Sequence, residues 1–230
     1  MAIVPVFPFI CYLVNEDIDV TVAEIQIILN LVTLRATSSM ENNYGIAAAL
    51  KMSENLSVAL SHMLLAGTGI YCLIQIKDDS VFLPHATFGI ITVHNIIAVW
   101  RWGSDQGLRV NDIYNFTSYT QLLFALPCIT TTLWLANGYQ REISWAWAIV
   151  PMIPFVCYLI NDFDMTLIEI MVLLNSAAVG AVSFKAGNNF GIAAAVAYAI
   201  SHFCINRFVV YNCGLCFFAY FSLRALGYGG

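Results

Sequence analysis

The sequence predicts an all-α protein, a polytopic bundle of about seven to nine apolar helices that crosses a membrane. Of its 230 residues, 60% are hydrophobic and 10% are charged, whereas soluble domains carry about 25% charged residues. The mean hydropathy is +0.77. The apolar residues also gather in runs of about 20, the length that a helix needs to cross the hydrocarbon of a bilayer. We therefore expect an integral membrane protein of the plasma membrane or an endomembrane.

Charge and cysteine content narrow the classes of partner and cofactor. The net charge is −5, so the chain lacks the basic surface that binding to nucleic-acid phosphates requires. The lipid bilayer is the expected partner. A second membrane protein, or a second copy of the chain, is a possible further partner. The seven cysteines are odd in number and lie in or beside apolar runs, which argues against a disulfide framework. No cofactor or metal motif is present, because the C-x-x-C pair at 213–216 has no second pair beside it.

Seven apolar runs after residue 50 account for most of the predicted spans. They are 55–76, 84–102, 117–136, 143–160, 165–183, 189–205 and 208–226. Two further segments, 2–14 and 20–36, precede them, and the first is too short to span unaided. Pro127, Pro151 and Pro154 fall inside spans, where each predicts a kink. The polar segment 103–116 is predicted to be a solvated loop.

An internal repeat is the most informative feature of the organisation. Residues 1–50 resemble 147–196: AIVPVFPFICYLVN at 2–15 matches AIVPMIPFVCYLIN at 148–161, and NNYGIAAA at 42–49 matches NNFGIAAA at 188–195. A repeat of this kind can indicate a transporter of two symmetric halves. Here, however, it stops at Lys51, and 55–136 has no second copy. We therefore predict a truncated duplicate, 1–51, ahead of a complete helical unit, 52–230.

Three short stretches of the 52–230 unit carry a family resemblance. They are MSENLSVALSH at 52–62, NNFG at 188–191 and SLRAL at 222–226. With these stretches the unit resembles the transmembrane protein 276-like family of small multi-pass membrane proteins. The resemblance implies an integral membrane protein without an established catalytic motif.

Ionisable residues inside spans are candidates for function, because burying a charge in hydrocarbon costs several kcal/mol. Glu169 is the clearest case, and Asn175 and Ser176 lie about two turns further along the same predicted helix. This polar stripe could bind a proton or a cation, with His94 and His202 as neighbours. The alternative is that Glu169 lies at the headgroup level and has only a structural role.

Histidines in apolar runs form a second set of candidates. His62, His94 and His202 each stand alone in a predicted span, without an H-x-x-x-H partner. Imidazole can carry protons or bind metal near neutral pH. A lone histidine in a membrane more often makes one hydrogen bond between helices, and metal binding would need three ligands to converge.

The segment Asn188-Asn189-Phe190-Gly191 follows a polar loop and is predicted to begin a helix. Asparagine is a favoured N-cap, and Gly191 permits close helix packing. The functional alternative is a helix N-terminus that binds an anion. We favour the packing interpretation.

Together these patterns favour a multi-pass membrane protein that acts through helix packing or partner contacts. A proton- or cation-coupled transporter that uses Glu169 is the alternative. An intramembrane hydrolase with dispersed residues is a further one, because membrane hydrolases need no linear motif. No linear catalytic motif is present, so the sequence favours a protein that is not an enzyme and names no catalytic residue.

Overall fold

A computed structural model describes residues 43–77, 82–104, 107–160 and 164–229, with side chains from residue 54 onward. The predicted segments 2–14 and 20–36, and nearly all of the first copy of the repeat, lie outside these residues. The chain divides into two compact units, Met1–Asn55 and Leu56–Gly230. The duplication itself stays a prediction.

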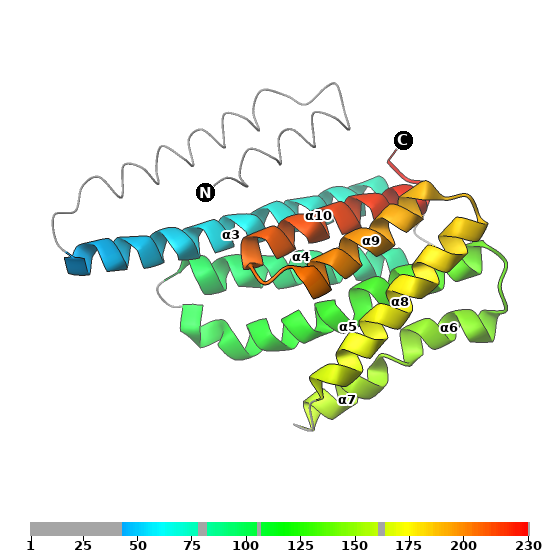
Figure 1. The fold of residues 1–230 in the computed structure, drawn as a ribbon, viewed down its shortest axis with the longest axis horizontal. Helices are drawn as coiled ribbons and strands as arrows, with labels where there is room; N and C mark the ends of the chain where they lie inside the picture. Colours follow the sequence, from blue (N-terminus) through cyan, green and yellow to red (C-terminus); the bar gives the residue numbers. More distant parts are fainter. Residues whose placement is uncertain (1–42, 78–81, 105–106, 161–163, 230) are drawn as a thin grey trace. The chain divides into compact units, whose positions relative to one another are not determined.

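The described part of the chain is helical and contains no strand. The helices are α3 (Asn43–Gln75), α4 (Phe82–Gly103), α5 (Asn111–Ala136), α6 (Arg141–Ile149), α7 (Met152–Leu159), α8 (Met165–Lys185), α9 (Asn189–Cys204) and α10 (Phe208–Ala225), with a 3₁₀ turn, η1 (Gly107–Val110), ahead of α5. Figure 1 shows α3, α4, α9 and α10 running along one another, with α8 crossing beside α5. The predicted all-α class is confirmed.

The number of spans is lower than the seven to nine predicted. Six segments of the described chain are long and apolar enough to cross a membrane, the pair α6–α7 counting as one. The run expected at 189–205 is helix α9, which has only 16 residues. It ends early because Ile205, Asn206 and Arg207 form a short connection to α10.

Two boundaries differ from the sequence prediction. Helix α3 continues through Lys51 and Met52, where the repeat stops. The supposed loop 103–116 is largely helical, because η1 leads directly into α5 at Asn111. Asp112 lies in the first turn of α5, where a negative charge is favourable, and Arg101 Nε donates to Asn111 Oδ1 at 3.0 Å. These polar residues therefore belong to the start of a helix and not to a loop.

The kink predicted at Pro151 is present as a break between α6 and α7. Val150 and Pro151 form a turn, because proline lacks the amide that would continue the ladder of α6. Pro154 lies in the first turn of α7, where it is tolerated. Pro127 lies inside α5, which continues through it.

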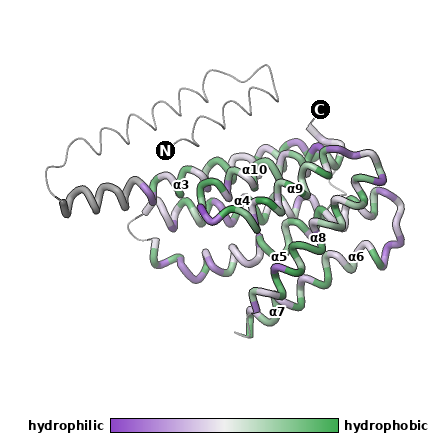
Figure 2. Tube along the Cα trace, in the orientation of Figure 1, coloured by the Kyte–Doolittle hydropathy of each residue, from purple (hydrophilic) through white to green (hydrophobic). Residues whose placement is uncertain are grey.

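Within the Leu56–Gly230 unit, helices that are far apart in sequence share one core. Helix α9 packs on α10 and α8, and α5 packs on α4, α6 and α8. Phe88, Leu126, Val179 and Phe218 are among the side chains that are completely buried. Figure 2 shows long hydrophobic stretches along the helices, with hydrophilic residues mainly near helix ends. This distribution suits a bundle that faces lipid, and the chain is a multi-pass membrane protein.

Candidate functional site

A polar cavity of about 240 Å³ lies inside the Leu56–Gly230 unit, between helices α3, α4, α5, α9 and α10. Its lining comprises His62, His94, Tyr114, Ser118, Gln121, Leu122, His202, Ile205, Asn206, Arg207, Phe208, Tyr211 and Asn212. His62, His94, Gln121 and Asn212 are buried, whereas Asn206, Arg207 and Phe208 are exposed. The buried residues form the floor of the cavity and the exposed ones form its mouth.

Asn95 fixes the orientation of His62 on the floor. It is fully buried, and its Oδ1 accepts a hydrogen bond of 2.6 Å from His62 Nδ1. Its Nδ2 donates to Ile91 O at 2.7 Å and to Gln121 Oε1 at 2.9 Å. Because a carbonyl oxygen can only accept, the His62 proton lies on Nδ1. The Nε2 atom of neutral His62 is therefore a basic lone pair.

His94 on α4 contacts a hydroxyl group at the corresponding nitrogen. Its Nδ1 lies 3.0 Å from Thr117 Oγ1, which also lies within 2.9 Å of Ile113 O. Because a hydroxyl group both donates and accepts, this contact is compatible with either tautomer of His94. The two imidazole rings meet edge to face, with centroids 6.0 Å apart.

His62 Nε2 has no hydrogen-bond partner among the described residues, although the side chain is only 3% exposed. A buried polar atom without a partner costs free energy, about 1–3 kcal/mol. Such an atom in a native protein is therefore a sign of a special role.

Two other residues connect the floor to helix α10. Asn212 Nδ2 donates to Ser61 Oγ at 2.9 Å, and Ser61 Oγ donates to Val58 O at 2.7 Å. This chain of bonds holds α10 against α3 beside His62. The cavity is thus supported by hydrogen bonds from neighbouring helices and is not a gap left by poor packing.

Of the five residues predicted as an intramembrane site, the structure brings only part together. His94 and His202 line the cavity. Glu169 is exposed on α8 and does not line the cavity. Its carboxylate nevertheless lies within electrostatic range of the half-buried His202 ring.

Asn175 and Ser176 lie away from the cavity, in the contact surface of α8. Both are buried, and Asn175 Nδ2 donates to Met171 O of its own helix at 3.0 Å. The Asn175 Oδ1 and Ser176 Oγ atoms have no partner among the described residues. Neither residue lines the cavity that His94 and His202 line.

Asn188 begins helix α9 and also ties that helix to the end of α10. Its Oδ1 accepts from Gly191 N at 3.1 Å, and its Nδ2 donates to Ala225 O at 2.8 Å. Asn189 is the exposed first residue of the helix. Gly191 is buried against Ser183 of α8, and a Cβ atom added to it would lie 2.7 Å from Ser183 Cβ. This motif joins three helices by packing and hydrogen bonds.

Replacing Asn188 separates its two roles. We expect Asn188→Ala to destabilise the fold by about 1–2 kcal/mol, because the cap and the bond to Ala225 are both lost. Asn188→Asp keeps the accepting oxygen and loses only the donor, so its cost should be about half. Thermal unfolding in detergent micelles measures both. Equal costs for the two variants would contradict the double role.

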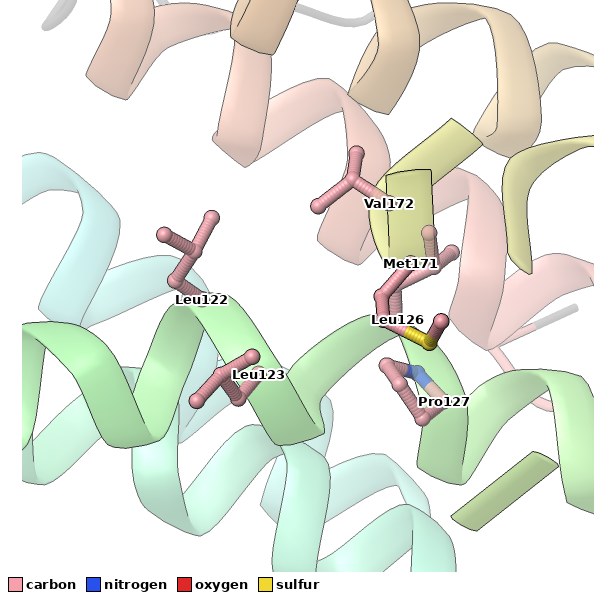
Figure 3. A pocket seen from close by; sticks show the side chains of 6 residues that line it. All are labelled: Leu122, Leu123, Leu126, Pro127, Met171 and Val172. Carbon is pink, nitrogen blue, oxygen red and sulfur yellow. The ribbon is translucent and has the colours of Figure 1, made fainter. Parts of the chain in front are cut away.

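A second, apolar crevice lies where α5 meets α8. Figure 3 shows Leu122, Leu123, Leu126 and Pro127 of α5 facing Met171 and Val172 of α8. It has no room for a water molecule and carries no polar side chain. We assign it to helix packing.

Metal binding receives no support from the part of the chain that the structure describes. There, no three His, Cys, Asp or Glu side chains lie close enough together to hold a metal ion. The two histidines on the floor therefore lie without a third ligand of these types in that part of the chain.

The prediction from sequence missed most of the residues around the histidines. Asn95, Gln121 and Asn212 are polar residues within predicted spans, but they are not ionisable, so the rule that was applied to Glu169 did not select them. Tyr114 and Arg207 stand at the ends of helices, where polar residues are ordinary, so no sequence signal marked them.

Searches of family models, curated proteins and solved structures find no match to this chain. The fold and the cavity define its class. It is a multi-pass helical membrane protein with a polar cavity, beside which two histidines lie, each hydrogen-bonded to another side chain.

Proposed function

We propose that the protein binds a small polar solute in this cavity and exchanges protons with it, as a proton-coupled transporter does. The observation that carries the proposal is the pair of imidazole rings of His62 and His94, whose centroids lie 6.0 Å apart beside the cavity. Each ring is held by a hydrogen bond at Nδ1, and His62 Nε2 is buried without a partner among the described residues. Imidazole is a common proton-transfer group within membrane proteins.

A path for protons toward the cavity is supported by the position of His202. This residue lines the cavity and lies within electrostatic range of the exposed Glu169 carboxylate. Glu169 therefore places a negative charge near His202, outside the cavity. The proposal differs from the sequence hypothesis, because the titrating groups are the histidines on the floor and Glu169 is an accessory.

Proton flux into vesicles tests the proposal. Full-length protein is reconstituted into liposomes that contain a pH-sensitive dye, and an inward proton gradient is imposed. We expect acidification by the wild type, and a decrease of about 100-fold in His62→Gln and His94→Gln, because removing a positioned proton-transfer group typically costs that much. His85→Gln is the matched control, since His85 is half-buried on α4 and does not line the cavity.

The same assay also tests whether Glu169 has only an accessory role. Glu169→Gln should reduce the flux less than either histidine variant does. A loss of flux as large as that of the histidine variants would show that Glu169 is itself essential for proton transfer. Absence of flux in the wild type, or full flux in His62→Gln and His94→Gln, would overturn the proposal.

Other functions suggested by the sequence stay predictions. Partner contacts and a dispersed hydrolase site have no observation in their favour within the described residues. The resemblance to the transmembrane protein 276-like family likewise stays a prediction.

A further inference from the structure

We infer that the solute is a short carboxylic acid that binds in its uncharged form, between the side-chain amides of Gln121 and Asn212. The inference rests on the proposed function, because it names the class of solute that would occupy the same cavity. Both residues line the cavity and are buried, Gln121 being 6% exposed and Asn212 1% exposed. Their hydrogen bonds fix which end of each amide is left for a ligand.

The amide of Gln121 is oriented by a chain of bonds that begins at a backbone carbonyl group. Ile91 O can only accept, so the Asn95 atom that lies 2.7 Å from it is the donating Nδ2. The same Nδ2 donates its second hydrogen to Gln121 Oε1 at 2.9 Å. The oxygen of Gln121 therefore faces Asn95, and the Nε2 donors are left for the cavity.

The amide of Asn212 is oriented in the opposite sense. Val58 O can only accept, so Ser61 Oγ donates its single hydrogen to it at 2.7 Å. Ser61 Oγ then has only lone pairs for Asn212, and the Asn212 atom that lies 2.9 Å from it is the donating Nδ2. The Oδ1 acceptor of Asn212 is therefore the end that is left over.

Both of these amide ends are open to a molecule in the cavity. The side-chain hydrogen bonds of Gln121 and Asn212 to other described residues all use the opposite ends of the amides. Neither Gln121 Nε2 nor Asn212 Oδ1 is among the partnerless side-chain atoms that the described bundle seals off completely, as it does His62 Nε2. Unused polar groups on buried residues that line a cavity favour a polar ligand.

One donor opposite one acceptor selects the charge state of the ligand. An uncharged carboxylic acid accepts at its carbonyl oxygen and donates from its O–H, so it can bond to both Gln121 Nε2 and Asn212 Oδ1. A carboxylate can only accept, so one of its oxygens would face Asn212 Oδ1 with no proton between them. Its charge would also be taken out of water.

The size of the cavity and the proposed function narrow the class further. The volume of about 240 Å³ has room for roughly eight water-sized groups, at about 30 Å³ each. A primary amide has the same donor and acceptor pattern as a carboxylic acid. Only the acid carries a dissociable proton, which the proposed function requires, so that each bound molecule brings one proton with it.

Saturation-transfer NMR of the full-length protein in deuterated detergent micelles tests the inference with three probes of similar shape. They are propionic acid, propionamide and butanone. We expect the first two to bind. Butanone has a carbonyl group but no N–H or O–H, so it should bind about tenfold more weakly than propionamide, because Asn212 Oδ1 would stay unpaired. This comparison uses wild-type protein and does not depend on the folding of a variant.

Variants of the two amides test the assignment of the site. Gln121→Met and Asn212→Leu should each weaken propionamide binding about tenfold, since each loses one hydrogen bond to the ligand. Gln75→Met and Asn175→Leu are the matched controls, because they make the same changes in helices at positions that do not line the cavity. They should leave binding unchanged, and size-exclusion chromatography verifies that all four variants are folded.

The pH dependence of binding identifies the charge state of the ligand. The titratable or charged groups of the lining are His62, His94, Tyr114, His202, Arg207 and Tyr211, and Glu169 lies near His202. These groups act on propionic acid and propionamide alike, so the ratio of the two affinities reports on the ligand itself. The ratio should fall about tenfold per unit between about pH 6 and 8, because a carboxyl group loses its protonated fraction at that rate well above its ordinary pKa of about 4.

Several results would overturn the inference. They are absence of binding of both propionamide and propionic acid, equal affinity for butanone, unchanged binding in both amide variants, and an affinity ratio that does not fall with pH. Proton flux in liposomes without binding of these probes would refute this inference and leave the proposed function standing. Binding with the expected pattern but without proton flux would refute the proposed function and leave the binding site standing.

Discussion

Gly191→Leu is expected to destabilise the α8–α9–α10 contact severely, so that the variant aggregates or unfolds at a markedly lower temperature than wild type. Even a single Cβ at this position would lie 2.7 Å from Ser183 Cβ, and 3.7 Å from Ala225 Cβ of α10. Overpacking of a tight core costs about 1–3 kcal/mol and sometimes more. Thermal unfolding in micelles and size-exclusion chromatography measure the loss.

Smaller changes at the same contact provide the controls. Gly191→Ala should be destabilising as well, and the added Ser183→Gly change should restore much of the stability, because it removes the atom in conflict. Gly67→Ala in α3 meets nothing within 4 Å, so its stability should be unchanged or higher. A Gly191→Leu protein with wild-type unfolding would show that α8 and α9 do not pack as closely as described.

Asn95→Leu is expected to abolish proton flux while leaving the protein folded. Leucine is similar in size to asparagine, and interhelical hydrogen bonds in membranes average about 0.6 kcal/mol, up to about 1.7. The fold should therefore survive. His62 would lose the acceptor that holds its proton on Nδ1, so its ring would no longer be fixed in one orientation and tautomer, and we expect flux to fall about 100-fold.

Asn175→Leu is the matched control for this change. Asn175 is equally buried in a helix, but it bonds only to its own helix and does not line the cavity. Its replacement should leave proton flux unchanged. Nitrogen NMR of labelled histidine adds a direct readout, because the tautomer signal of His62 should change in Asn95→Leu and not in Asn175→Leu. Normal flux in Asn95→Leu would show that proton transfer does not depend on the orientation that Asn95 gives to His62.

The sequence predicted individual helices well, because crossing hydrocarbon imposes a length and an apolar composition on each one separately. The spans expected at 84–102 and 165–183 correspond to α4, Phe82–Gly103, and α8, Met165–Lys185. The segment 103–116 was wrongly predicted because polarity was taken to mean a loop. Its polar residues Asn111 and Asp112 instead occupy the first turn of a helix.

The candidate site could be predicted only in part, because it depends on contacts between helices. His62 and His94 are 32 positions apart, and nothing in the local pattern of α3 or α4 indicates that their rings meet. Asn95 supplies the link, since it follows His94 directly and bonds to His62. Glu169 attracted attention as a charge within an apolar run, yet its place near the start of α8 leaves it exposed.

The 16-residue length of α9 has a consequence for the bilayer around the protein. At 1.5 Å per residue this helix is about 24 Å long, shorter than the ~30 Å hydrocarbon layer. A helix too short for its membrane is accommodated by local thinning of the bilayer. The headgroups and water of one leaflet are therefore drawn inward beside the connection at 205–207, where Arg207 stands. If α9 crosses the bilayer, such thinning would bring headgroups and water close to Arg207 without any movement of the helices.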